Sequence, residues 1–419
     1  MKKALICLEK LDIGGVETFT ITQIEEFVRR GIECYVLSKD GILREKLNNI
    51  KNVKWIEFDF KLERTLNHEK INELEKLILK KKIDFIYVHQ FSCIEYILPI
   101  ALKHKIPYVA YLHNIVPKTC EWFMEHYEIY KTLFPIYFRY ASKIIAITAR
   151  VYEEHINLFK LPKEKYIILN NSLDFSKYPD KKIEKLNTNF DKLLWFGRVS
   201  EQKRNSIEIG IEFYNYIKKY NKDAKLTIVG DGEILDEFKE KYKEKNINFI
   251  GAVSDMTPYI EDSDILLGVD RCMLEAVASK KPAVICGYRK NLVLVTPSII
   301  KAAIKENFTG INLKDDKEEI LKYNEKELKK IIEKNYSYVK ENLQITNSVY
   351  LDIEPMEFIN IDLNQIIENT NENVEKICSL ENESKRLFLD NQRLYSLMDK
   401  SSKKKMFDKL KFLIRKDDN

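Results

Sequence analysis

Two cations near the middle of the chain, Arg198 and Lys203, have the types and spacing that suit a diphosphate. Arg198 follows Gly197 in a run, 193–199, that predicts a strand, and Lys203 lies five residues further along the same loop. A guanidinium offers a fork of donors and an ammonium a point charge, so the pair would bind a diphosphate and stabilise a departing phosphate. Taken alone, such a pair is more often two solvated loop cations.

A second candidate site contains Asp270, Arg271 and Glu275. The apolar run 265–269 predicts a buried strand, and 274–279 favours a helix after a short polar loop. The first N–H groups of a helix lack partners, and the helix dipole favours negative charge there. Arg271 and Glu275 are four residues apart and therefore project from one face. Spacing alone favours a surface Arg–Glu pair, but the two cations described above favour a phosphate site.

Two histidines, His89 and His113, each end a predicted strand, where residues of a cleft belong, although a histidine there is more often structural. No two of the six histidines have the spacing of a metal site, and the seven cysteines include no C-x-x-C pair. An acidic segment, 262–264, precedes a strand instead of following one, and we interpret it as a polar loop. The chain therefore predicts no metal and no bound cofactor.

The elements that must position these residues alternate strand and helix twice. In the first half, Gly14 and Gly15 follow a strand and begin a helix that Gly31 ends. Glycines there let backbone approach a phosphate closely, although a lone pair of glycines is more often simply a turn. After a polar stretch, 174–189, which we interpret as a linker, the alternation starts again. The predicted strands are 3–8, 32–38, 83–89, 106–114, 143–148 and 166–171, then 193–199, 225–230, 247–251, 265–269 and 283–286.

This alternation predicts an α/β fold of two Rossmann-like domains that face a cleft. A chain of 419 residues with 45% hydrophobic residues is long enough for two cores. Its net charge of +5 is too small to indicate a nucleic-acid partner. The start of the sequence has neither the pattern of a signal peptide nor that of a membrane span, and its cysteines suit a reducing compartment. We expect a cytoplasmic location, which would include the inner face of the cell membrane if the end of the chain binds lipid.

The last part of the chain has a different pattern. A loose heptad in 364–398 has six apolar residues at ten positions, which suits a marginal coiled coil and equally a helix packed on its own domain. Residues 403–416 carry seven basic residues and one Asp, and their apolar residues fall on one helical face. That segment suits either a helix on an anionic membrane surface or a solvated basic end.

Over about residues 1–350 the chain resembles the family-4-type retaining glycosyltransferases, which have the GT-B fold. The resemblance rests on several stretches that occur in the family's order. They are GGVE at 14–17, the strand-ending His113, FGRVSEQK at 196–203, IVGDGE at 228–233, INFIGAVSD at 247–255 and LEAVASKKPAVI at 274–285. The stretch GVDRCMLEAVA, followed by TPSIIKAAIKENFTG, is similar to a subset associated with bacterial surface polysaccharide, in capsule or lipopolysaccharide.

The resemblance implies roles toward the nucleotide of a nucleotide-sugar donor. Glu275 would hold the ribose hydroxyls, and Arg198 and Lys203 would clamp the diphosphate. Val253 and Ser254 would lie by the base. Such enzymes need no metal, in agreement with the missing metal pattern.

The resemblance also implies roles toward the donor sugar. Gly15 would let backbone meet the phosphate or the sugar from across the cleft, and His113 would meet the sugar near the reacting carbon. The family usually has two glutamates eight positions apart, the first of which contacts the sugar, but here that position is Leu267. Asp270 and Arg271 lie in the loop that should face the sugar, and either would compensate.

We therefore expect a metal-independent retaining glycosyltransferase that moves a hexosyl- or N-acetylhexosaminyl-type sugar from a nucleotide-diphosphate donor to a glycan or lipid-linked acceptor. The expected parts are an acceptor-side domain, 1–178, a nucleotide-sugar-binding domain, 188–350, and a helical tail, 351–419, whose 364–398 would pair with a partner helix or a second copy. Two alternatives stay open. One is a non-catalytic scaffold subunit of a glycan-assembly complex, and the other is a nucleotide-sugar epimerase with the same fold.

Overall fold

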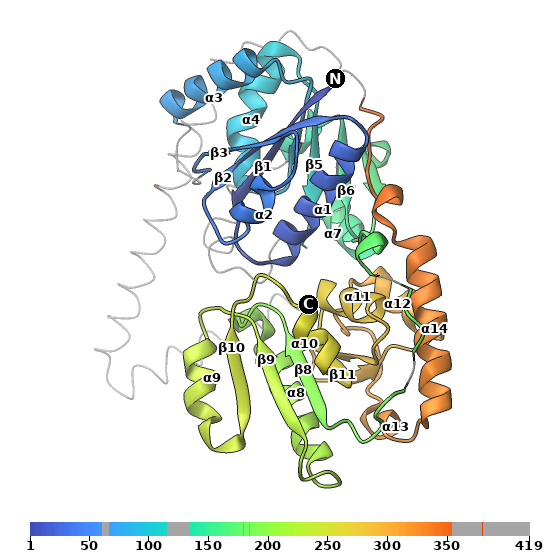
Figure 1. The fold of residues 1–419 in the computed structure, drawn as a ribbon. Coiled ribbons are helices and arrows are strands. Elements are labelled where there is room, and N and C mark those ends of the chain that lie inside the picture. Colours follow the sequence, from blue (N-terminus) through green and yellow to red (C-terminus); the bar gives the residue numbers. More distant parts are fainter. Residues whose placement is uncertain (61–66, 115–134, 179, 184, 354–378, 380–419) are drawn as a thin grey trace, which may run out of the picture.

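The computed structural model describes residues 1–60, 67–114, 135–178, 180–183, 185–353 and 379, and these residues form two α/β domains (Figure 1). The first domain, blue to cyan in the figure, lies above the second, which is green to orange. The predicted coiled-coil segment 364–398, apart from residue 379, and the basic end 403–416 lie outside the described residues.

The first sheet has seven parallel strands in the order β3-β2-β1-β4-β5-β6-β7. The strand order reverses between β1 and β4, and ligands bind at such reversals in parallel sheets. Its strands are β1 (Lys3–Lys10), β2 (Glu33–Lys39), β3 (Val53–Glu57), β4 (Phe85–Val88), β5 (Tyr108–Leu112), β6 (Lys143–Ala146) and β7 (Tyr166–Ile168). Its helices are α1 (Gly15–Arg29), α2 (Arg44–Asn48), α3 (His68–Lys81), α4 (Phe91–His104) and α7 (Ala149–Phe159).

The second sheet has six strands in the order β10-β9-β8-β11-β12-β13, with a reversal between β8 and β11. All its pairs are parallel except that of β13 with β12. Its strands are β8 (Lys192–Phe196), β9 (Lys225–Val229), β10 (Ile247–Gly251), β11 (Ile265–Gly268), β12 (Ala283–Cys286) and β13 (Leu292–Leu294). Its helices are α8 (Arg204–Ile217), α9 (Leu235–Lys241), α10 (Thr257–Asp262), α11 (Arg271–Ala278), α12 (Ile300–Lys305), α13 (Lys317–Ile320) and α14 (Glu325–Asn342).

Every strand predicted from an apolar run overlaps an observed strand, and the prediction of two Rossmann-like domains is confirmed. Two strands were not predicted. β3 is a half-buried edge strand that contains Lys54 and Glu57, so it has no continuous apolar run. β13 is only three residues long and pairs antiparallel with β12, which departs from the strand–helix alternation.

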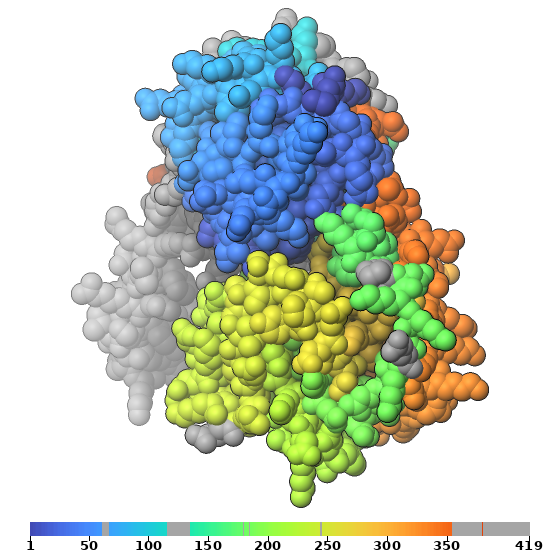
Figure 2. All heavy atoms as spheres, viewed as in Figure 1, coloured from blue at the N-terminus to red at the C-terminus, as the bar shows by residue number. Residues whose placement is uncertain are grey.

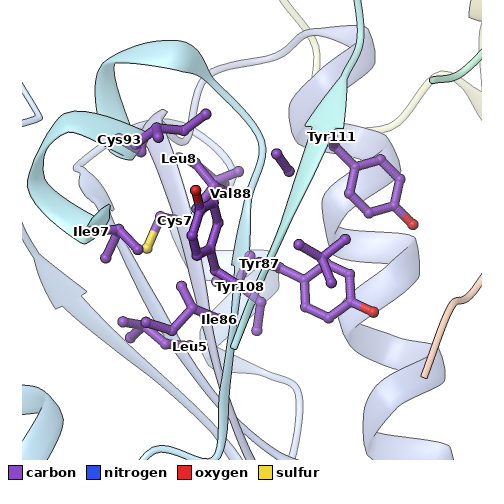
Figure 3. Packing of buried hydrophobic residues seen from close by; sticks show 14 of the residues in the cluster. Leu5, Cys7, Leu8, Ile86, Tyr87, Val88, Cys93, Ile97, Tyr108 and Tyr111 are labelled. Atoms are coloured by element: carbon purple, nitrogen blue, oxygen red, sulfur yellow. The ribbon is translucent and has the colours of Figure 1, made fainter. Parts of the chain in front are cut away.

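The central strands of the first sheet are packed on both faces (Figure 3). Figure 3 shows Cys93 and Ile97 of α4, one turn apart, beside Cys7 of β1 on one face. Tyr87 and Tyr111 point to the other face, where α1 covers them. All five side chains are buried. This packing fixes the carboxyl ends of β1, β4 and β5, where candidate site residues follow.

The chain passes between the two domains twice. After β7, Leu173 and Phe175 pack into the core of the second domain, and after α14 Ile345 packs into the core of the first. The two passing segments are hydrogen-bonded, since Leu173 N donates to Leu343 O at 3.0 Å and Ile345 N donates to Leu173 O at 2.8 Å. The limits 1–178, 188–350 and 351–419 stay a prediction. Leu173 and Phe175, which these limits assign to the first domain, pack in the core of the second. Ile345, which they assign to the second domain, packs in the core of the first.

Helix α14 runs along the outer side of the second domain (Figure 1). Its N-terminus is closed by a reciprocal capping box between Asn324 and Glu327, and Leu328, Ile332 and Tyr336 are buried at helical spacing. It is an amphipathic surface helix. Among the described helices, none combines the length and the apolar character needed to cross a membrane.

Candidate functional site

A cleft of ≈ 2220 Å³ lies between the carboxyl ends of the strands of the two sheets. Ligands of parallel α/β sheets bind at such strand ends. In Figure 2 the first domain, in blue, meets the yellow and green second domain along a seam. The structure brings every candidate residue of the sequence to the lining of this cleft. They are Gly14, Gly15 and His113 from the first domain, and Gly197, Arg198, Lys203, Val253, Ser254, Asp270, Arg271 and Glu275 from the second.

The first turns of two helices face each other across the cleft. α1 begins at Gly15 and α11 at Arg271, and a Cβ atom on Gly15 would lie 3.9 Å from Cβ of Arg271. Neither N-cap residue, Gly14 or Asp270, makes a side-chain hydrogen bond to its helix. N–H groups of both first turns are therefore left for a ligand, and both helix dipoles favour an anion between them.

Arg198 reaches from the end of β8 toward the first domain. A Cβ atom on Gly14 would lie 2.7 Å from Nη2 of Arg198 and 2.2 Å from Oε2 of Glu17. The guanidinium and the carboxylate thus both lie over Gly14, where an added side chain would have to displace them. Arg198 is exposed, and within the described residues its guanidinium has no ion pair.

Glu17, in the first turn of α1, was not among the predicted site residues. It is buried, and its Oε2 has no hydrogen-bond partner within the described part of the chain. Burial raises the pKa of this carboxyl, and a hydrogen bond to its own backbone and the nearby charge of Arg198 offset part of that effect. The GGVE stretch contains Glu17, but its letters alone do not show that the carboxylate would meet a cation from the other domain.

Lys203 is held in the cleft by Asp270. Nζ of Lys203 lies 3.1 Å from Oδ2 of Asp270, and the Tyr288 hydroxyl donates to the same oxygen at 2.7 Å. Burial acts to lower the pKa of Lys203, but Asp270 and Cys272 together outweigh it and the pKa is raised, so the ammonium keeps its proton. Asp270 has φ +60° and ψ −143°, a conformation that residues other than glycine rarely adopt. Tyr288 lies in the loop after β12, and no sequence signal pointed to it.

The pair of Arg271 and Glu275 is not on the surface. Arg271 is only 5% exposed, and its Nε lies 3.1 Å from Oε1 of Glu275. Its Nη1 donates to the carbonyl oxygen of Ser172 at 2.8 Å, where the chain first passes between the domains. The interpretation as a surface pair is wrong for Arg271. Its guanidinium is used within the protein, which favours an orienting role over direct contact with a substrate.

The structure corrects the alignment at Leu267. This residue is fully buried in β11, where it pairs with Trp195 and Val284 of the neighbouring strands. β11 ends at the next residue, and only Val269 and Asp270 separate it from α11. Counting eight positions back from Glu275 therefore selects a core position, because the loop is short. Asp270 is the acidic group that this loop presents to the cleft.

His113 follows β5 and lies beside His89, which follows the neighbouring strand β4. Nε2 of His113 and Nδ1 of His89 are 3.0 Å apart. Burial, with a smaller contribution from the charge of Arg271, lowers the pKa of His113 to about 3. Burial first, and then His113, lowers the pKa of His89 well below its usual value. Both rings are therefore neutral near pH 7.

The ends of β8, β9 and β10 form another wall of the cleft. Gly230, after β9, has φ +145°, and a Cβ atom there would lie 1.8 Å from the carbonyl oxygen of Gly197. Only glycine fits this close backbone approach. Val253, which packs partly on the second core, and the exposed Ser254 follow β10 at the same wall. At these positions the wall offers backbone and small side chains to the cleft.

Two family models match the chain, one in each domain. The model described as Glycosyltransferase Family 4 matches residues 13–177, and that described as Glycosyl transferases group 1 matches residues 191–304. No curated protein sequence is significantly similar to the chain.

Several solved structures are similar over most of the chain. HepE of Anabaena, in complex with UDP and glucose, has a TM-score of 0.60 and 17% identity, covering 88% of this chain and 99% of that chain. A glycosyltransferase from Rickettsia africae has a TM-score of 0.56 and 16% identity, with coverages of 88% and 98%. A TarM mutant of S. aureus, in complex with fondaparinux, alpha-GlcNAc-glycerol and UDP, has a TM-score of 0.56 and 12% identity, with coverages of 89% and 99%. At these identities the likeness establishes the fold, which is GT-B.

Proposed function

We propose that this chain moves a sugar from a nucleotide-diphosphate sugar to a growing glycan or glycolipid, with retention at the anomeric carbon, because its two domains match two glycosyltransferase family models and have the GT-B fold. The observation that carries this proposal is the convergence of two uncapped helix starts with Arg198 and Lys203 on one cleft. The sugar would be of the hexosyl or N-acetylhexosaminyl type, and the product a cell-surface polysaccharide such as capsule or lipopolysaccharide.

The diphosphate would lie between the starts of α1 and α11, clamped by the two cations. Glu275, oriented by its contact with Arg271, would accept hydrogen bonds from the ribose hydroxyls. The base would lie along Val253 and Ser254. A structural neighbour, HepE, is known in complex with UDP and glucose, which supports a uridine nucleotide as the first donor to test.

Stabilisation of the leaving group would supply most of the rate. As the bond between the anomeric carbon and the phosphate oxygen breaks, that oxygen takes the electron pair and gains negative charge, which Arg198, Lys203 and the helix N–H groups would stabilise. The acceptor hydroxyl would bond to the anomeric carbon from the same face and give its proton to the departing phosphate. Protein cations would supply the positive charge, so no step of the proposal calls for a metal. Asp270 would face the sugar hydroxyls.

The test is incubation of the full chain with UDP-glucose, UDP-N-acetylglucosamine and GDP-mannose, without and with lipid-linked acceptors extracted from the cells that make the protein. Transfer that needs acceptor, with the product keeping the donor's anomeric configuration by NMR, would support the proposal. An epimerised nucleotide-sugar in the absence of acceptor would indicate the epimerase. A folded chain that binds none of these nucleotides by calorimetry would indicate the scaffold.

A further inference from the structure

The two histidines at the ends of β4 and β5 form a pair that the proposed chemistry has not used. β4 and β5 are hydrogen-bonded neighbours, so the residues that follow them meet at one edge of the sheet. Nδ1 of His89 and Nε2 of His113 are 3.0 Å apart, which is a good N–H···N hydrogen-bond length. One ring must donate and the other must accept.

The surroundings hold both rings in place. The ring of Tyr111 stacks on His89 at 4.8 Å between centroids and on His113 at 5.6 Å, and Phe19 of α1 contacts both histidine rings edge-on. Tyr111 is itself fixed by a 2.7 Å hydrogen bond from Nε2 of Gln23. A neutral pair fits this apolar environment, and the lowered pKa values of both histidines agree with it.

The position of the shared proton follows from the second nitrogen of His89. His89 is 2% exposed, and its Nε2 is buried with no hydrogen-bond partner among the described residues. If that nitrogen carried the proton, a buried N–H would be left without an acceptor, and orphaned N–H groups are rarer in proteins than under-used acceptors. The proton of His89 therefore belongs on Nδ1, from which it is donated to Nε2 of His113.

We infer that His89 is a positioning residue that fixes the proton of His113 on Nδ1, so that His113 offers the cleft a hydrogen-bond donor. His113 lines the cleft and its Nε2 is taken by His89, so Nδ1 is the ring nitrogen left for a ligand. A nitrogen that carries its proton cannot act as a base. His113 would donate this hydrogen bond to an oxygen of the donor sugar or of its leaving phosphate. The identity of that ligand rests on the proposed function.

The first test reads the proton directly and needs no activity. In the full chain labelled with 15N, two-dimensional NMR of the imidazoles distinguishes a protonated nitrogen from a bare one, and a His113→Gln sample assigns the signal. We expect His113 to show a protonated Nδ1 and a bare Nε2. A proton on Nε2 of His113 in the wild-type chain would overturn the inference.

The second test replaces His89, the hydrogen-bond partner of His113. An Asn side chain can place its amide N–H where Nδ1 of His89 lies, whereas Phe fills the space without a donor. We expect His89→Asn to keep the His113 tautomer and wild-type turnover of UDP-glucose within about threefold, while His89→Phe loses the fixed tautomer and about 10- to 100-fold in kcat with KM for UDP-glucose nearly unchanged. Equal losses in the two variants would contradict a role through the donated hydrogen bond.

His155 supplies the matched control. It is a buried histidine of the same domain, its Nδ1 lies 2.8 Å from the hydroxyl of Tyr166, and it does not line the cleft. His155→Phe should leave the tautomer of His113 and the turnover unchanged once its melting temperature is taken into account. If the wild-type chain turned over no donor yet showed the expected tautomer, the proposed function would fail while the inference on His89 would stand.

Discussion

The two sides of the cleft differ in how they handle buried charge. On the second domain's side, Lys203 is paired with Asp270, and Arg271 with Glu275. On the first domain's side, the paired histidines are neutral and Glu17 keeps an oxygen without a partner within the described residues. A buried charge is costly unless it is paired, so the second side is organised for charge and the first is not.

This difference indicates which part of a ligand belongs on which side. A diphosphate needs fixed positive groups that are already in place before it binds, and the second side has them. Sugar hydroxyls and a neutral acceptor need hydrogen-bonding groups without net charge, and the neutral histidine pair would offer one such donor, Nδ1–H of His113. Arg198 belongs to the second domain but lies over Gly14 of the first, so this charged group reaches across the boundary between the domains.

The largest effect on turnover is expected from Arg198→Ala. Loss of a preorganised donor to a departing phosphate should lower kcat by about 10²- to 10³-fold. The melting temperature should hardly change, because the guanidinium is exposed and has no ion pair within the described residues. Arg204→Ala is the matched control, since Arg204 is paired with Glu201 and Glu237 and does not line the cleft. Equal turnover in the two variants would remove Arg198 from the chemistry.

A smaller loss is expected from Asp270→Gly. The substitution removes the partner of Lys203 and should lower turnover by about 10- to 100-fold. Glycine accepts φ +60° without strain, which should offset the lost ion pair and keep the melting temperature near that of the wild-type chain. Asp270→Asn, which removes only the charge, should lose turnover similarly and be less stable than the glycine variant. Full turnover in the Asn variant would show that the second side does not depend on this pair.

Gly14→Ala tests whether Arg198 must lie over the first domain. Its Cβ atom would displace the ends of Arg198 and Glu17, both flexible side chains, so folding should be kept while turnover falls about tenfold. Gly15→Ala has room in the ligand-free cleft, where the nearest atom is Cβ of Arg271 at 3.9 Å. Its stability should therefore match the wild type, and any loss should appear in the affinity for UDP by calorimetry. A wild-type kcat in Gly14→Ala would mean that Arg198 need not lie over the first domain.

The smallest effect on turnover, and a clear one on stability, is expected from Glu95→Gln. Glu95 lies on α4 of the first domain, away from the cleft, and burial raises its pKa to about 8, offset in part by a hydrogen bond from Tyr137. Because the folded pKa lies above the ordinary value, this group's contribution to stability is full below about pH 4.5 and is lost as the pH rises through 8.

The free energy of unfolding of the wild-type chain should therefore fall relative to Glu95→Gln between about pH 4.5 and 8. Denaturant melts of the two chains at several pH values measure it. A constant difference across that range would show that the first domain holds this carboxylate at its ordinary pKa. Turnover at pH 7 should be the same in both.

Apolar runs predicted all strands except β3 and β13, and local patterns predicted most of the cleft residues, whereas Val253 and Ser254 were expected there only from the family resemblance. Apolar runs become buried strands, and residues after parallel strands gather at one edge, which is why every candidate residue lines the cleft. The partner of each residue was harder to predict. Tyr288 meets Asp270 only through the fold of the second sheet, and Glu17 meets Arg198 only because the two domains face each other.

Leu267 shows where counting positions fails. The spacing of the family's two glutamates presumes a loop of fixed length, and the loop between β11 and α11 has only two residues. The contact between His89 and His113, in contrast, was within reach of the sequence. Both were placed at strand ends, and consecutive strands of such sheets are usually neighbours.

The two hydrogen-bonded passages of the chain between its domains have a mechanical consequence. A single linker would let one domain twist freely relative to the other. Two hydrogen-bonded segments instead form a hinge that allows bending mainly about one axis. Opening and closing of the halves should therefore follow one axis. The second passage also supplies part of the first core, because Ile345 packs there. A fragment that ends at residue 178 would lack this side chain.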